Sequence, residues 1–188
     1  MIKDLFLALE QKLLAVTDEQ PEPQPLFKHC DLWNRQVEFI EQETQFLTPA
    51  VFVEFMPIPW EQLGKNIQEA DLTVHFHIVT PWHANTASNI INPEVRATAL
   101  SYLDIPTVLF RQLHGQHGSF GTGNFNALTR VKSIPNHDHE RFVDSIEEYR
   151  CRLKDLSYTV RTMAQAIIQA TSPPLIRFNT EAWLRILA

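Results

Sequence analysis

The sequence has little of several residue types that would mark a specialised fold or partner. Cysteine occurs only twice in 188 residues, too rarely for a disulfide framework. No stretch reaches the ~18 apolar residues of a membrane-spanning helix, and residues 1–10 lack the pattern of a signal peptide. The formal charge of −6 argues against a broad nucleic-acid-binding surface. We therefore expect a soluble chain in which Cys30 and Cys151 are reduced.

The residues that are present suffice for one full core. Hydrophobic residues make up 44% and charged residues 20% of a chain whose length is typical of one domain. We expect a single α+β domain over residues 1–188. Its parts are an N-terminal helix at 2–16, a proline-rich connector at 17–25, a sheet and helix core at 26–155 and a C-terminal extension at 156–188.

Alternation of apolar and polar residues predicts the strands. At 71–80, four apolar residues alternate with Thr73, His75 and His77, which is typical of a sheet with one buried face. Similar signals predict strands at 50–56, 125–134 and 142–154, and helical spacing predicts a second helix at 94–114. The expected architecture is a mixed, mainly antiparallel sheet with helices packed chiefly on one face. Residues 26–46 fit either a helix or a strand.

Most of the glycines lie in one loop, at Gly115, Gly118, Gly121 and Gly123. The loop lacks the lysine of a phosphate-binding loop and follows a predicted helix, so we interpret it as the approach to a hairpin. Beyond it, the polar side of the strand at 148–154 carries Arg150, Arg152 and Lys154. We predict that this loop and these three cations form a subunit interface, because glycines leave a loop free to become ordered against a neighbour.

Histidines provide the only pattern that suggests metal chemistry. His75 and His77 lie on the same side of a predicted strand, and further potential ligands, including Asp138 and Glu140, occur at 137–140. The sequence does not indicate that the two groups meet, and polar histidines on a sheet or in a turn are usually solvated. From the sequence alone we therefore expect no metal, no cofactor and no catalytic residue. Zinc addition and chelation are then expected to leave stability unchanged.

Several segments resemble the tail-terminator, or tail-completion, proteins of tailed bacteriophages and prophages. The resemblance covers roughly residues 26–155 and follows the order of helix, strand pair, helix, glycine-rich loop and strand pair. The segments are DLWNRQ at 31–36, PAVFVEF at 49–55, ADLTVHFH at 70–77, LFRQLHG at 109–115, TR at 129–130 and DHERFVD at 138–144.

This resemblance implies a structural, non-enzymatic role. Tail terminators form a ring that closes the head-proximal end of the tail tube and joins it to the neck, so the implied partners are other copies of the chain, with a hexamer as one form, and the tail-tube and neck proteins. The implied location is the virion tail, and the host cytoplasm during assembly. DNA would pass through the ring without sequence-specific binding. Two alternatives stay open: a metal-dependent enzyme using His75, His77 and 137–140, and an unrelated binding module.

Overall fold

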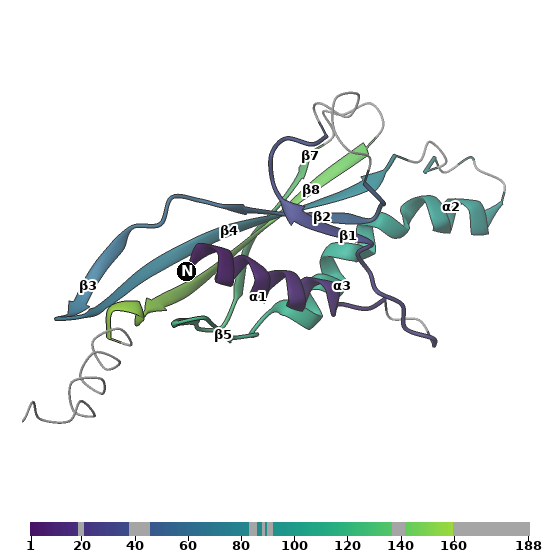
Figure 1. Ribbon diagram of the computed structural model, residues 1–188. Coiled ribbons are helices and arrows are strands. Elements are labelled where there is room, and N and C mark those ends of the chain that lie inside the picture. Colours follow the sequence, from purple (N-terminus) through teal and green to yellow (C-terminus); the bar gives the residue numbers. More distant parts are fainter. Residues whose placement is uncertain are drawn as a thin grey trace, which may run out of the picture.

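The protein is described by a computed structural model that covers residues 1–18, 21–37, 46–82, 86–87, 89, 92–136 and 142–159 (Figure 1). Its elements are α1 Ile2–Leu14, β1 His29–Leu32, β2 Ala50–Phe55, β3 Trp60–Gly64, β4 Ile67–Pro81, α2 Pro93–Leu100, the short 3-10 helix η1 Ser101–Asp104, α3 Ile105–Leu113, β5 Gly118–Phe120, β6 Gly123–Phe125, β7 Thr129–Asn136 and β8 Phe142–Asp155. None of these helices is long and apolar enough to cross a membrane.

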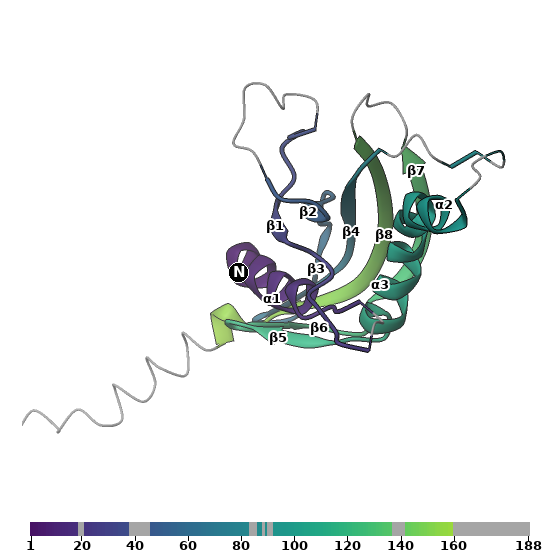
Figure 2. The same cartoon turned by 90° about the vertical axis from the view of Figure 1, so that its right-hand side faces the viewer.

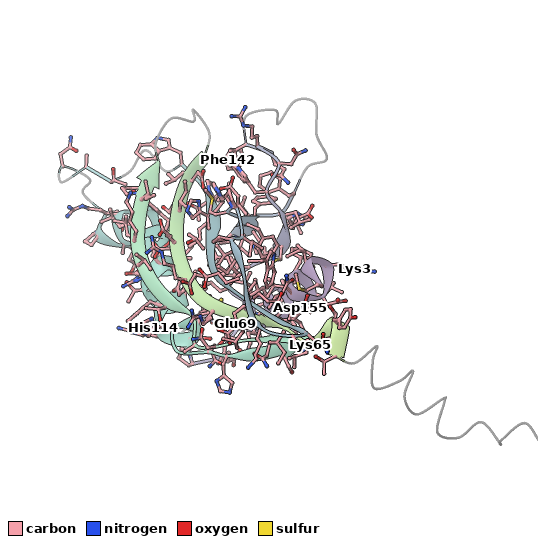
Figure 3. All side chains as sticks on the ribbon, turned by 90° about the vertical axis from the view of Figure 1, so that its left-hand side faces the viewer. Lys3, Lys65, Glu69, His114, Phe142 and Asp155 are labelled. Atoms are coloured by element: carbon pink, nitrogen blue, oxygen red, sulfur yellow. The ribbon has the colours of Figure 1, made fainter. Side chains whose placement is uncertain are left out.

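The described strands form one sheet in the order β1-β2-β4-β8-β6-β5, with β3 added to β4 and β7 added to β8. Only the pairing of β1 with β2 is parallel. The centre of the sheet is the long antiparallel pair β4 and β8, whose register runs from Gln68 opposite Asp155 to Pro81 opposite Phe142. Figure 3 shows Phe142 and Asp155 at opposite ends of β8. The mixed, mainly antiparallel sheet and the α+β class are confirmed.

The main core lies between the helices and one face of the sheet. In α1, Leu5, Leu9 and Leu13 recur every fourth residue and are buried, because this spacing places them on one side of the helix. Together with buried residues of α3 they contact the inward side chains of β4 and β8. Figure 2 shows α1 and α3 in front of the curved sheet. The predicted packing of helices chiefly on one face is confirmed.

A smaller apolar cluster is formed by residues of β2, β4 and β8 together with residues that follow β1 in the sequence. Buried Ala50, Phe52 and Val79 contact Trp33 and Phe142 there. It uses the residues of β2 that alternate with those of the main core. Both faces of β2 are therefore apolar, which explains its nearly unbroken hydrophobic sequence.

Several predicted boundaries were wrong. The helix expected at 94–114 is divided into α2, η1 and α3, because Pro106 lacks the N–H that a continuous helix needs. The strand expected at 125–134 is two strands, β6 and β7. The connector at 17–25 folds back on itself through a bridge between Thr17 and Pro25.

Other elements were not foreseen. β1 resolves part of the ambiguous segment 26–46 as a strand, and β3 was not predicted. Both are short edge strands, whose pairing depends on a neighbour more than on their own sequence pattern. The extension beyond residue 159 lies outside the described residues.

Candidate functional site

Acidic and histidine side chains from three adjacent strands meet on the face of the sheet opposite the main core. The register places Glu54 of β2 opposite His75 of β4, and His75 opposite Glu148 of β8. Side chains at paired positions of neighbouring strands lie close enough to interact. His77 and Asp144 complete the group. We call these five residues the histidine–carboxylate cluster.

One carboxylate oxygen joins the two imidazoles. Glu54 Oε2 lies 3.2 Å from His75 Nδ1 and 3.1 Å from His77 Nε2. On the far side of each ring stands a carboxylate of β8: Asp144 Oδ2 is 3.1 Å from His77 Nδ1, and Glu148 Oε2 is 3.7 Å from His75 Nε2. Each histidine therefore lies between two carboxylates, and Glu54 is shared by both.

Trp33 covers the buried histidine. Its ring stacks on His77 with a centroid separation of 3.7 Å and an interplanar angle of 7°. The backbone N–H of Trp33 donates to the carbonyl of Val53 at 3.0 Å. The side chain of Gln36 closes the following turn by donating to the carbonyl of Leu32. The segment after β1 is thereby held over the sheet.

This cover makes the environment of His77 different from the one expected. His77 is only 4% exposed, so the expectation that histidines on the polar side are solvated is wrong for this residue. Asp144 behind it is 1% exposed, and its Oδ1 has no hydrogen-bond partner among the described residues. By contrast, the Glu54 side chain is 37% exposed, which leaves the cluster accessible from that side.

The arrangement is suited to binding a proton or a cation. Glu54, His75 and His77 offer three ligand atoms that all lie within 4.8 Å of one another. A neutral imidazole has one N–H and one lone pair, whereas both nitrogens of His77 face carboxylate oxygens. A second proton or a cation is therefore needed to satisfy every contact of this ring.

Sequence reasoning identified His75 and His77 but missed the acids. Glu54, Asp144 and Glu148 are distant from the histidines in the sequence, and the pairing of β4 with β2 and β8 brings them together. The available signal was a single acid inside the apolar strand at 50–56, where a charge needs a partner. The other potential ligands that the sequence offered, at 137–140, lie outside the described residues.

The glycines of the predicted interface have identifiable positions. Gly115 and Gly121 have φ angles of +81° and +45°, a region that favours glycine. Gly118 and Gly123 lie in the β5–β6 hairpin, so this segment is itself a hairpin and not the approach to one. A Cβ on Gly123 would approach the Lys154 carbonyl oxygen to 2.6 Å, so this glycine permits close packing of two strands.

The cations of the predicted interface lie beside this hairpin. Asn124 of β6 pairs with Lys154 of β8, so the structure brings the loop and one end of the charged strand together. Arg152 and Lys154 are within ion-pair distance of Glu69, and Arg150 of Glu148. Figure 3 shows Glu69 toward the Asp155 end of the sheet. Whether these residues contact another subunit stays a prediction.

A second polar group is buried on the core side of β8. Burial raises the pKa of the Glu147 carboxyl, while a hydrogen bond from Ser133 and the charge of Arg130 oppose the rise. Ser133 Oγ donates to Glu147 Oε2 at 2.8 Å, and Arg130 Nη1 lies 3.6 Å from the same oxygen. This group anchors β7 to β8.

The two thiols do not contribute to either polar group. Burial raises the pKa of both Cys30 and Cys151 to about 12. Both are free cysteines, and a thiol with a raised pKa is a poor nucleophile because the thiolate is the reactive form.

Comparison with known proteins identified no relative: no protein-family model matches the chain, and a search of curated proteins found no significant match.

Proposed function

We propose that this protein is a structural subunit of a phage or prophage tail, which assembles into a ring at the head-proximal end of the tail tube and joins the tube to the neck. The resemblance of residues 26–155 to tail terminators supports this proposal, and the α+β fold agrees with it. The ring would act by closing and connecting the tube and would carry out no reaction.

The observation that carries the proposal is a sheet with two different open edges. β1 borders one side of the sheet, and on the other side β7 pairs with residues 144–150 of β8 while the β5–β6 hairpin pairs with residues 153–155; Figure 2 shows β1 and β7 on opposite sides. Within the described residues no strand pairs with the outer side of either, although at the start of β7 the backbone N–H of Arg130 donates to His114 Nδ1 at 3.2 Å. Each edge also exposes a large apolar side chain: Leu32 of β1 is 45% exposed and Val131 of β7 is 48% exposed.

Two unlike edges on one subunit suit a ring. In a head-to-tail ring every subunit uses two different surface patches, one for each neighbour. Open strand edges provide such patches because their unpaired N–H and C=O groups can pair with another chain. The overall negative charge would also suit a channel for DNA, since basic contacts to phosphates would hold the passing strand.

Edge variants test this arrangement. We expect Leu32→Lys and Val131→Lys each to remain folded, because exposed substitutions usually change stability by less than ~0.5 kcal/mol. Each should fail to form the ring, because a charge on a strand edge opposes pairing. A mixture of the two should form a dimer and nothing larger, since the intact β7 edge of one variant meets the intact β1 edge of the other.

Size-exclusion chromatography with light scattering measures these states, and tail maturation in a complementation assay measures the function. Leu7→Lys, at an exposed position of α1, is the matched control and should assemble as the wild type does. Wild-type protein that stays monomeric with tail-tube protein present and is absent from mature tails would refute the proposed function. If either edge variant forms a normal ring without the other variant present, the proposed role of these edges would be refuted.

A further inference from the structure

We propose that Glu54, His75 and His77 bind a divalent transition-metal ion of the zinc type, with Asp144 and Glu148 orienting the two imidazoles. The sequence alone led to the opposite expectation, because it did not indicate that the two histidines meet the potential ligands at 137–140 or any other third ligand. The pairing of β2 with β4 supplies that ligand as Glu54. The inference concerns this chain whether or not it forms a tail ring.

Two of the three distances between the ligand atoms are close to those of a tetrahedral site. Zinc binds imidazole nitrogen at about 2.0–2.1 Å and carboxylate oxygen at about 2.0–2.2 Å. Two ligands of a regular tetrahedron with such bonds are about 3.3–3.5 Å apart. The two nitrogens of the cluster are 3.1 and 3.2 Å from Glu54 Oε2. At these two contacts a metal ion therefore requires only a small outward movement of each nitrogen from Glu54 Oε2, and the two nitrogens lie within 4.8 Å of each other.

Both histidines have an acid behind the ring. Metal-bound histidines typically donate their other N–H to a carboxylate, which sets the tautomer and the direction of the lone pair. Asp144 Oδ2 has this position at His77 Nδ1, leaving Nε2 to face Glu54. Glu148 stands at His75 Nε2 at the longer distance of 3.7 Å. Stacking by Trp33 further fixes the His77 ring.

The charges of the cluster favour a divalent ion over a neutral hydrogen-bond network. Glu54, Asp144 and Glu148 bring three carboxylates, and the only cation that pairs with them in the described residues, apart from the histidines, is Arg150, 3.0 Å from Glu148. With neutral imidazoles two negative charges are unbalanced, and a divalent ion neutralises both. Asp144 is nearly fully buried and its Oδ1 has no partner in the part of the chain that the structure describes, so the hydrogen bonds among these groups do not satisfy the buried acid.

The donor set indicates which metals bind. Imidazole ligands suit zinc, copper, iron and nickel, whereas calcium and magnesium prefer oxygen ligands throughout. Two histidines and one carboxylate provide three protein ligands and leave a fourth position for water or another group. Glu54 is the most exposed of the three, so we expect this fourth position on its side of the cluster.

Calorimetric titration of the metal-free full-length protein with zinc chloride tests the proposal. Wild-type protein should bind one equivalent, and its melting temperature should rise and return on chelation, because a ligand that binds only the folded state stabilises it. Glu54→Gln and His75→Asn should each weaken zinc binding by more than ~10–100-fold, which is the typical loss when a carboxylate that only orients a ligand is replaced. Calcium chloride should produce no shift. X-ray absorption at the zinc edge should show two imidazole ligands in the wild type.

His117→Asn is the matched control, because His117 is exposed and distant from the cluster in the sheet; its zinc affinity should equal that of the wild type. Circular dichroism establishes that the variants are folded, and Glu54→Gln is the decisive one, since it preserves shape at a partly exposed position. Absence of one-equivalent binding by the wild type would overturn the proposal. Unchanged zinc affinity in folded Glu54→Gln protein would also overturn the proposal. The side chains of the cluster would then be joined by hydrogen bonds and not by a metal ion.

Discussion

Replacing Tyr149 by phenylalanine should stabilise this protein, which is unusual for a change at a buried position. The ring of Tyr149 is fully buried in the main core, 5.3 Å from the ring of Phe76. Its hydroxyl is buried too and has no hydrogen-bond partner among the described residues. Burial raises the pKa of this hydroxyl above its ordinary value, and the charge of Glu147 adds to the rise. The group is therefore neutral at the pH of the assay.

The expected gain follows from the cost of an unpaired polar group. A buried donor or acceptor without a partner costs about 1–3 kcal/mol. Tyr149→Phe removes that group and keeps the aromatic ring, so it creates almost no cavity and preserves the contact with Phe76. We expect the free energy of unfolding to rise by about 1–2 kcal/mol. For a protein of this size each kcal/mol corresponds to about 2–4 °C in melting temperature.

Urea unfolding followed by tryptophan fluorescence measures the change, and an unchanged denaturant slope would show that only stability was altered. Tyr102→Phe is the control: Tyr102 is only partly buried in η1, and its replacement should change stability by less than ~0.5 kcal/mol. A Tyr149→Phe protein that is less stable than the wild type would refute the reasoning, because the hydroxyl would then make a net favourable hydrogen bond.

Two further predictions concern charges on β8. Burial raises the pKa of Glu147 in the folded protein above its ordinary value of 4.5. As the pH rises, this carboxyl therefore loses its proton in the unfolded chain before it does so in the folded protein. Its contribution to stability is complete below pH 4.5 and is lost as the pH rises through the folded-state pKa. Glu147→Gln should therefore reduce the loss of stability as the pH rises above 4.5, measured by thermal unfolding; an equal loss in both proteins would contradict this. Arg150→Glu with Arg152→Glu should retain the fold, because both side chains are more than half exposed and such pairs contribute about 0–1 kcal/mol. Assembly should weaken relative to a Lys3→Glu, Lys28→Glu control, and normal assembly would remove these arginines from the predicted interface.

Strands with a clear alternation were predictable because their pattern is local. Residues 72–78 and 149–153 both place apolar side chains on one face, and burial of that face needs no information about the partner strand. The amphipathic α1 was predictable for the same reason. The short β1 and β3 were not, since each is stabilised by pairing with a neighbour.

The sequence by itself determined the fold class, the inward faces of the alternating strand segments and of α1, and the two histidines of the candidate site. Local periodicity carries that information, because it states which side chains share a face. Only the tertiary structure decided that Glu54 faces His75 and His77, that Asp144 and Glu148 stand behind them and that Trp33 covers His77. Which residues become neighbours across a sheet depends on strand order and register, and these are set by the packing of the whole chain.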